Sequence, residues 1–312
     1  MFYISSFKYK RSTVAERYIL MNSINEYYYI KSFDEIKSTL DSNNSLGGLR
    51  FMPEMIIFCG KRFEVEKNVR RVAIEFNSLG YLNGVIMLKD IYCDGTYHGN
   101  CSRKCRILWK KEWLDKEKPN NNDQEKYIDD FVKIYTTEPI MCQSSTLKNA
   151  TQFIPLSTLK SLTNKNYLKN ITFFNLIRDL YYGARYYINP MNWVVLGEKR
   201  KTPTESLGLK VGDMVEVKTL DEIKTTLSRF GKNRGLGFQK EMVKFCGGRY
   251  RVSKIVKNAI SEEDGTYRAV KNSVILEGVN CDGSYHKRCE RSCPHIWREI
   301  WLKRLNENTH RR

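Results

Sequence analysis

A duplicated block restricts the fold of this chain more than any other feature of its sequence. Residues 31–67 align with residues 218–254 without a gap at a spacing of 187 residues, and residues 93–114 align with 281–302 at a spacing of 188. About half of the aligned positions carry identical residues. Two copies with so long a period indicate two similar domains, whereas a solenoid stacks many short repeats.

The positions of the two copies divide the chain into three parts. We predict a first cysteine-rich module at residues 1–115, a middle segment at 116–206 and a second cysteine-rich module at 207–312. The middle segment begins with polar residues and an asparagine run, which is typical of a linker. Residues 170–188 predict a helix, because an asparagine can cap its start, apolar residues recur at spacings of three and four, and a proline follows its end.

Each copy carries the signals of a small β-rich module. Thr219 and Glu222 match a capping box, a hydroxyl N-cap followed three residues later by Glu, and Ser32 and Glu35 repeat the pattern. Stretches rich in Val and Ile then predict two antiparallel strands. We expect these strands at residues 249–256 and 273–281 in the second copy and at 63–69 and 85–93 in the first. By analogy of element order, we predict an α+β fold of two small SH3-like β-barrels joined by the partly helical middle segment.

The end of each copy is open to two interpretations. Trp297 and Trp301 are four residues apart, as are Trp109 and Trp113, and this spacing suits one face of a helix. A final strand at residues 299–304 is the alternative. In either case we expect the tryptophans to pack in the core of their module.

The cysteines follow the duplication. Eight of the nine belong to the two copies, four in each: Cys59, Cys93, Cys101 and Cys105, and Cys246, Cys281, Cys289 and Cys293. Each copy also has one matched histidine, His98 or His286, so both contain a distant cysteine followed by C-x4-H-x2-C-x3-C. Thiolate and imidazole are ligands that Zn²⁺ prefers, and metal closure supplies folding free energy to a small module. We predict two structural zinc ions per chain.

The sequence leaves the fourth ligand of each site open. The preferred ligands are the three cysteines that lie close together in the sequence of each copy: Cys93, Cys101 and Cys105, and Cys281, Cys289 and Cys293. The fourth is Cys59 or His98 in the first module, and Cys246 or His286 in the second. Disulfides, buried thiols and a catalytic or iron–sulfur site remain alternatives. We expect Cys142 to be an ordinary buried thiol and His295 not to be a ligand.

Several motifs resemble a family of uncharacterised bacterial proteins with two tandem cysteine-containing halves. The first half contributes FMPEMIIFCGKRFEV and CDGTYHGNCSRKC, and the second contributes FCGGRYRV, VILEGVNCDG and CPHIWREIWLKR. The resemblance covers most of the chain. It implies the division into two modules and implies no activity, substrate or catalytic residue.

Charge and composition guide the functional prediction. The chain has 53 Lys and Arg against 35 Asp and Glu, a net charge of +18, and 41% hydrophobic residues, which excludes a disordered tail. No stretch has the length and hydrophobicity of a membrane span, and no secretion signal is evident, so we expect a cytoplasmic protein. The positive charge favours binding to nucleic acid or another anionic partner.

Two other functional classes remain open. A zinc-dependent enzyme or biosynthetic accessory protein would need a carboxylate near the metal, which Glu54, Glu241, Asp94 or Asp282 could supply. No HExxH, P-loop, nucleophile elbow or GxGxxG motif occurs, so we favour a binding protein over an enzyme. A scaffold that binds a partner protein is the third possibility.

Overall fold

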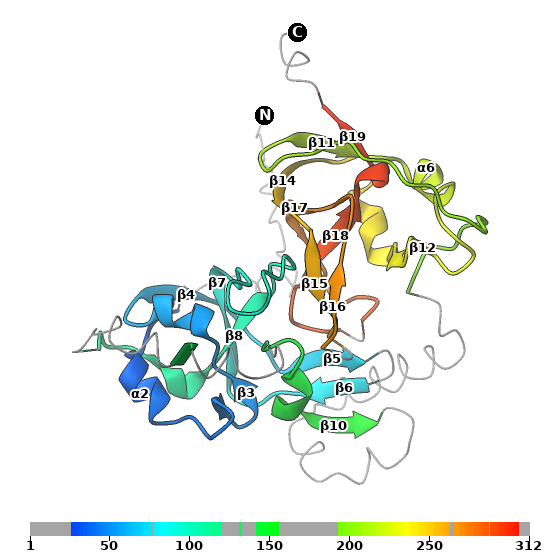
Figure 1. The fold of residues 1–312 in the computed structure, drawn as a ribbon. Helices are drawn as coiled ribbons and strands as arrows, with labels where there is room; N and C mark the ends of the chain where they lie inside the picture. Colours follow the sequence, from blue (N-terminus) through cyan, green and yellow to red (C-terminus); the bar gives the residue numbers. More distant parts are fainter. Residues whose placement is uncertain are drawn as a thin grey trace, which may run out of the picture.

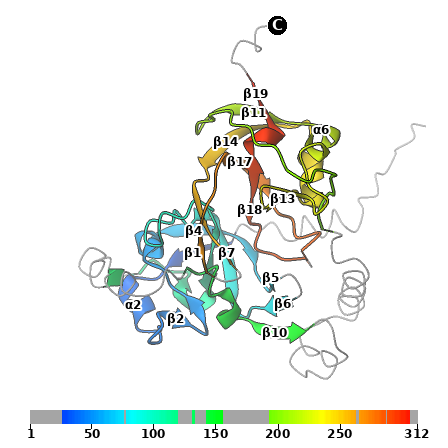
Figure 2. The ribbon, with the colours of Figure 1, turned by 45° about the vertical axis from the view of Figure 1, so that its right-hand side comes forward.

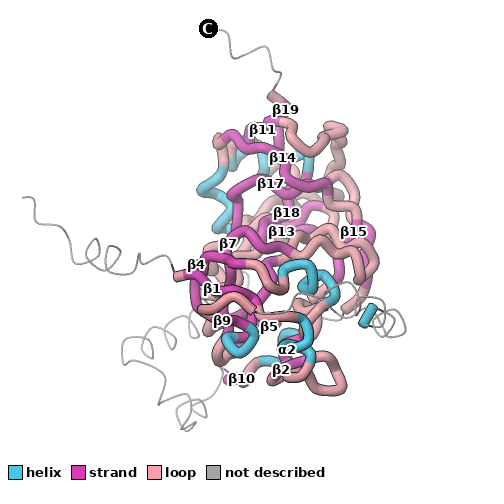
Figure 3. Tube along the Cα trace, turned by 90° about the vertical axis from the view of Figure 1, so that its left-hand side faces the viewer, coloured by secondary structure: helices cyan, strands magenta, loops and turns pink. Residues whose placement is uncertain are grey.

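A computed structural model describes residues 26–75, 78–119, 131–132, 142–155, 193–262, 265–286 and 288–305. This part of the chain is mostly β, with two curled half-barrel sheets and few helices (Figure 1). Figure 3 shows the two strand-rich modules one above the other. The arrangement agrees with the prediction of two similar β modules. The helix predicted at residues 170–188 and most of the predicted linker lie outside the described residues.

The first module is built on a five-stranded antiparallel sheet in the order β8-β7-β4-β1-β9. Its strands are β1 (Tyr27–Ile30), β4 (Arg62–Asn68), β7 (Val85–Tyr92), β8 (Arg106–Lys110) and β9 (Leu114–Asp115). Helix α2 (Phe33–Lys37), the hairpin of β2 (Ser45–Leu46) and β3 (Leu49–Arg50), and the 3₁₀ helix η1 (Pro53–Phe58) connect β1 to β4. A second 3₁₀ helix, η2 (Lys111–Trp113), precedes β9.

The second module repeats this order as β18-β17-β14-β11-β19. Its strands are β11 (Met214–Val217), β14 (Arg249–Ile255), β17 (Ser273–Asn280), β18 (Pro294–Arg298) and β19 (Leu302–Arg304). Its connections are α6 (Leu220–Lys224), β12 (Lys232–Asn233), β13 (Leu236–Gly237), η6 (Lys240–Phe245) and η7 (Glu299–Trp301). The predicted strand pairs β4–β7 and β14–β17 are confirmed, because each pair is antiparallel at the expected residues.

Capping explains where the short helix of each module begins. The hydroxyl of Ser32 accepts a hydrogen bond from the backbone N–H of Glu35, and the Glu35 carboxylate accepts one from the backbone N–H of Ser32 at 2.9 Å. Thr219 and Glu222 make the same two bonds. The two predicted capping boxes are therefore confirmed. They satisfy backbone donors that a five-residue helix leaves unpaired at its start.

Aromatic residues form the centre of each core. Trp113 and Trp301 are fully buried, and the indole N–H of Trp301 donates to the hydroxyl of Thr226 at 3.0 Å. Phe238 packs edge-on against Trp301, with ring centroids 5.2 Å apart. The interpretation of each tryptophan pair as one helical face is wrong, because Trp297 lies in strand β18 and Trp301 in the 3₁₀ helix that follows. The expectation that these tryptophans are core residues is confirmed.

The first module adds a third strand to a hairpin that both modules have among the described residues. Strand β10 (Gln152–Pro155) pairs with β6 (Ser78–Tyr81), which pairs with β5 (Arg71–Glu75). In the second module the corresponding hairpin consists of β15 (Asn258–Ile260) and β16 (Tyr267–Ala269) alone. The segment before β10 includes the 3₁₀ helix η4 (Leu147–Ala150), which contacts β3.

The two modules contact each other through equivalent surfaces. In each, the loop that carries the clustered cysteines reaches the backbone at the start of the other module's extra hairpin. The N–H of Ser102 donates to the carbonyl of Asn258 at 2.8 Å, and the N–H of Glu290 donates to the carbonyl of Arg71 at 2.9 Å. Ser102 aligns with Glu290, and Arg71 aligns with Asn258. The interface therefore resembles the isologous contact of a two-fold dimer within one chain. Figure 2 shows the second module above the first.

Glu262 connects the same two loops. Its carboxylate pairs with Arg103 of the first module at 2.8 Å and with Arg291 of the second module at 3.1 Å. These arginines occupy equivalent positions of the duplication. Burial raises the pKa of Glu262, but the charges of Arg103 and Arg291 outweigh it and leave the pKa below its usual value. Arg291 is therefore an interface residue and not part of a solvated basic face.

Candidate metal centres and the cavity between the modules

The first module gathers Glu54, Cys93 and His98 within one small volume. Their ligand atoms all lie within 4.8 Å of one another, and all three residues are buried. Nδ1 of His98 is 2.8 Å from Oε1 of Glu54, and Nε2 of His98 is 3.1 Å from Sγ of Cys93. Oε2 of Glu54 is buried and has no hydrogen-bond partner within the described part of the chain. A buried carboxylate oxygen without a donor is costly, and a metal ion would satisfy it.

The second module gathers the equivalent residues Glu241, Cys281 and His286. Nδ1 of His286 is 3.0 Å from Oε1 of Glu241 and 3.6 Å from Sγ of Cys281. Apart from this ion-pair contact with His286, neither carboxylate oxygen of Glu241 has a hydrogen-bond partner among the described residues. The two centres differ in exposure, because the side chain of His98 is 6% exposed and that of His286 is 27% exposed. Each half of the chain thus contains a cluster that could hold a metal ion.

A glycine turn brings the cysteine and the histidine together in both modules. Gly95 follows Cys93 by two residues and has a φ of 83°, in the left-handed region that other residues avoid. A Cβ at this position would overlap the carbonyl oxygen of Cys101. Gly283 has a φ of 75° and the same contact with Cys289. The loop can fold back on itself only with glycine at this position.

The structure places the other predicted ligands outside these three-residue clusters. In the first module, Cys101 and Cys105 line a cavity of about 20 Å³ together with Cys93 and His98. Cys142 lines the same cavity, although sequence reasoning treated it as an ordinary buried thiol. Cys59 is fully buried elsewhere, with its Sγ 4.0 Å from the carbonyl oxygen of Met55.

In the second module, too, the three-residue cluster contains only one of the four cysteines. The N–H of Cys281 donates to the carbonyl of Cys293 at 2.8 Å, so these two residues are adjacent. Cys246 and Cys289 are not in the cluster with Glu241. All nine cysteines belong to the described residues, and none forms a disulfide.

Burial makes these thiols weak acids in the absence of a metal. It raises the pKa of Cys93 and of Cys281 far above the ordinary value, and it raises the pKa of Cys59 to about 12. A neutral buried thiol is a poor nucleophile, whereas metal coordination deprotonates it. The environment of Cys93 and Cys281 therefore suits a metal ligand better than a free catalytic cysteine.

Sequence reasoning missed two features of these centres. Glu54 and Glu241 were considered only as carboxylates of an enzyme, although their identity across the duplication was visible. His295 has no counterpart in the first module, yet its Nε2 lies 3.8 Å from Oε1 of Glu241. Burial lowers the pKa of His295 to about 4, so the ring is neutral at pH 7. No pattern in the sequence indicated its position.

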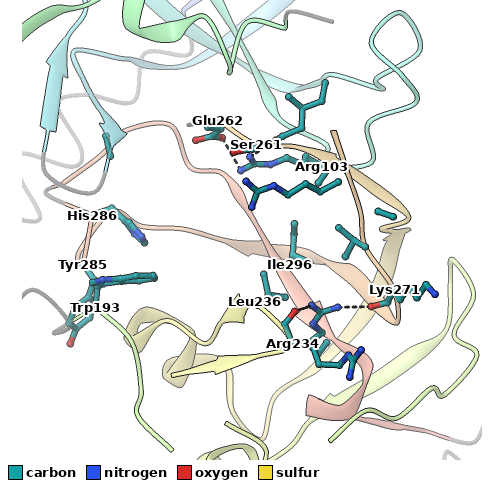
Figure 4. Close-up of a pocket in the computed structure, with 18 of the residues that line it drawn as sticks. Arg103, Trp193, Arg234, Leu236, Ser261, Glu262, Lys271, Tyr285, His286 and Ile296 are labelled. Atoms are coloured by element: carbon teal, nitrogen blue, oxygen red, sulfur yellow. Dashed lines mark hydrogen bonds and ion pairs between the residues drawn. The ribbon is translucent and has the colours of Figure 1, made fainter. Parts of the chain in front are cut away.

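A cavity of about 730 Å³ lies at the contact between the modules (Figure 4). Its lining includes Arg103 of the first module and, from the second, strands β13, β15, β16 and β18. His286 also lines it, so the second metal centre borders this cavity. Five Lys or Arg side chains and one Glu line the cavity: Arg103, Arg234, Arg268, Lys271, Arg298 and Glu262. Glu262 pairs with Arg103 of this set and with Arg291, so the basic side chains of the lining outnumber its carboxylates five to one.

No protein-family model matches this chain. No curated protein and no solved structure matches it either. The resemblance to bacterial proteins with two cysteine-containing halves therefore stays a prediction. Among the described residues, no helix is long and apolar enough to cross a membrane.

Proposed function

We propose that this protein binds nucleic acid through two small SH3-like barrels, each held in shape by one structural zinc ion. The SH3-like assignment is supported by the element order of each module. Five antiparallel strands curl so that the last pairs with the first, and a 3₁₀ helix precedes the last strand. Both copies of the duplicated block fold into this order.

Zinc is supported by the donor atoms of each cluster. A carboxylate, a thiol and an imidazole are all zinc ligands, and three donors already lie within 4.8 Å of one another in each module. In the first module, Cys101 and Cys105 line the adjoining cavity and are candidates for the fourth position. When bound, zinc would fix the cysteine loop against the sheet and supply folding free energy to a small core.

Metal analysis of the reduced, purified protein tests the zinc assignment. We expect about two zinc ions per chain, by the same donor chemistry. Glu54→Gln and Glu241→Gln should each remove one of them, because an amide oxygen is a much weaker ligand. Glu64→Gln is the matched control, since Glu64 belongs to neither cluster and its half-buried side chain pairs with the exposed Lys89. A folded, reduced protein with almost no zinc would refute the assignment.

The positive cavity between the modules is the observation that supports nucleic acid as the partner. Of the six charged side chains that line it, five are basic, and the single carboxylate, Glu262, pairs with one of the five, Arg103, and with Arg291. Trp193 and Tyr285 also line it, and aromatic rings stack on bases. Phosphate contacts and stacking together are the usual means of binding single-stranded nucleic acid.

Binding to labelled single-stranded oligonucleotides, measured by fluorescence anisotropy, tests this function. We expect an affinity that falls as salt rises, because each phosphate contact releases condensed counterions. Heparin is the control polymer, since it carries negative charge without bases to stack. Absence of binding at low salt would reject nucleic acid as the partner. Equal affinity for heparin would instead indicate a general polyanion surface.

An enzyme is the second candidate, and one observation favours it. His286 belongs to the second metal cluster and also lines the 730 Å³ cavity, so a ligand in the cavity would lie beside that centre. A catalytic zinc site keeps one position open for water or substrate. Turnover of a chromogenic phosphodiester that survives His98→Ala but is lost in His286→Ala would favour the enzyme. No turnover by the zinc-loaded protein would count against it.

A further inference from the structure

The first module contains a groove that the chain itself fills. The side-chain amide of Gln143 lies against strand β8 and bonds both backbone groups of Leu108. Its Oε1 accepts from the N–H of Leu108 at 2.8 Å, and its Nε2 donates to the carbonyl of Leu108 at 2.9 Å. Nε2 also donates to the carbonyl of Arg50 at 3.0 Å. A carboxamide thus completes the free edge of the sheet, and Leu108 is only 1% exposed.

The equivalent groove of the second module is the cavity. Ile296 pairs with Ile275 in β17 as Leu108 pairs with Met87 in β7, so it occupies the same register position. In an antiparallel edge strand, such a residue directs both its N–H and its C=O away from its neighbour. No hydrogen bond from outside the sheet reaches Ile296 within the described chain. Ile296 is half-buried and lines the cavity.

The aligned residues Gly48 and Gly235 show the same difference between a groove that the chain fills and one that its described residues leave uncovered. A Cβ at Gly48 would overlap the backbone of Asn149, because the chain covers the groove there. A Cβ at Gly235, its counterpart, would meet nothing within 4 Å, and Gly235 lines the cavity. The first module therefore shows how a ligand would lie in the second module. It would present an adjacent acceptor and donor to the backbone of Ile296.

The charge around this edge defines the rest of the ligand. Arg234 and Lys271 are exposed at the rim (Figure 4), and their side chains have no hydrogen-bond or ion-pair partner among the described residues. Arg298 is fixed by bonds to the carbonyls of Asn233, Arg234 and Lys271 and adds a third positive charge. A ligand that complements this site carries negative charge beside its amide-like edge.

We propose that this cavity binds a nucleotide, with the base edge on the backbone of Ile296 and the phosphate among Arg234, Lys271 and Arg298. Every nucleobase offers an adjacent acceptor and N–H donor on its Watson–Crick edge, which is the pattern that Gln143 presents in the first module. Trp193, on one wall, offers a ring for stacking. This site specifies the proposed function further. The view that the bound nucleotide belongs to a nucleic-acid strand rests on that proposed function.

A peptide with an exposed Gln or Asn would satisfy Ile296 equally well. The basic rim favours the nucleotide, because an amide side chain leaves the charges of Arg234 and Lys271 uncompensated. A peptide ligand is therefore the competing outcome of the test.

Fluorescence of Trp193 gives a direct readout with adenosine monophosphate as the probe. The four other tryptophans are fully buried, so Trp193 is the one that a ligand in the cavity reaches. We expect saturable quenching by adenosine monophosphate, with much weaker effects of adenosine or inorganic phosphate alone, and no signal in Trp193→Phe. Equal binding of phosphate alone would overturn the role of the base edge. Absence of quenching by adenosine monophosphate, together with quenching by a glutamine peptide, would replace the nucleotide by a peptide.

Variants at the basic rim and at the edge of strand β18 test the phosphate contacts and the base contacts separately. Arg234→Glu should weaken binding of adenosine monophosphate about tenfold or more, because it replaces an attractive charge with a repulsive one. Lys210→Glu makes the same charge change at an exposed position outside the cavity and should leave the affinity unchanged. Ile296→Pro removes the free N–H from an edge strand, where proline is tolerated, and should abolish binding of the nucleotide. Its zinc content and circular dichroism verify that it remains folded.

Binding of oligonucleotides shows whether the natural ligand is a free nucleotide or part of a nucleic-acid strand. If a strand is the natural ligand, Arg234→Glu should weaken oligonucleotide binding as much as it weakens adenosine monophosphate. If the strand binds normally to this variant, the cavity is not its site and the proposal fails while the proposed function stands. If adenosine monophosphate binds and no strand does, the proposed function fails and the cavity remains a nucleotide site.

Discussion

Replacing Glu262 by Gln should weaken the contact between the modules. The change removes the carboxylate that neutralises Arg103 and Arg291. The side chain of Arg291 is 4% exposed, so its charge would remain buried without a partner, whereas Arg103 is 24% exposed and water would partly solvate it. Breaking a buried pair costs about 3–5 kcal/mol, and an exposed pair contributes less than about 1 kcal/mol.

The exposure of Glu262 itself, 27%, reduces the cost below this range, because water partly screens the pair. We expect Glu262→Gln to lower the free energy of unfolding by about 2–3 kcal/mol and the melting temperature by roughly 5–10 °C. Urea unfolding and calorimetry measure the two quantities. A double-mutant cycle with Arg291→Met should give a coupling of at least about 1.5 kcal/mol, and a cycle with Arg103→Met should give less.

Glu216→Gln is the matched control for this experiment. Glu216 pairs with Arg249 at 3.4 Å on the surface, where Arg249 is 60% exposed, so its loss should change stability by less than about 0.5 kcal/mol. The reasoning is refuted if Glu262→Gln and Glu216→Gln have the same effect. Equal coupling of Glu262 to both arginines would contradict the role assigned to burial.

Three further predictions follow from the same structure. Because the pKa of Glu262 is lowered, its contribution to stability is complete above the ordinary value of 4.5 and disappears as pH falls through the lowered pKa. The difference in melting temperature between Glu262→Gln and the unchanged protein should therefore shrink below pH 4.5 and persist above it. Gln143→Leu should cost about 2–4 kcal/mol in urea unfolding, since it leaves the N–H and C=O of Leu108 buried and unpaired. Gly95→Ala should lower the zinc content by up to one ion per chain, whereas Gly212→Ala, at a φ of 97° with open space around it, tests the backbone strain alone.

The results that would contradict these predictions are equally specific. If the difference in melting temperature between Glu262→Gln and the unchanged protein stayed constant down to pH 3, the contribution of the Glu262 carboxylate to stability would not depend on its protonation. A neutral effect of Gln143→Leu would show that water satisfies Leu108. Full zinc content in Gly95→Ala would show that the cysteine loop can shift without releasing the metal.

The local structure of each module could be predicted from the sequence because short-range patterns determine it. The capping boxes at Ser32 and Thr219 and the strands at β4, β7, β14 and β17 depend on neighbouring residues and on alternation. The tryptophan pairs show the limit of such patterns. A spacing of four suits a helical face, but one tryptophan of each pair lies in a strand and the other in a 3₁₀ helix. Burial against Phe51 or Phe238 overrode the helical pattern.

The duplication alone also indicated which loops carry the candidate metal ligands. The repeated cysteines and histidines marked residues 93–105 and 281–293 without any structural information. The partners that complete the clusters, Glu54 and Glu241, come from 3₁₀ helices about 40 residues earlier in the chain. Only folding of the sheet brings these glutamates to the histidines. The sequence shows that both copies have a glutamate at this position, but it does not show that the glutamate lies beside the histidine.

The contact between the modules, and the cavity beside it, were decided by tertiary structure. Two similar modules face each other through equivalent loops, yet Gln143 fills the groove in one, and in the other no described residue covers the matching edge at Ile296. Sequence comparison of the two copies cannot show this difference, because the segment that fills the groove lies outside the repeat. The net charge of +18 belonged to the sequence from the start. Folding alone determined that five of the basic side chains surround one cavity that has a single carboxylate in its lining.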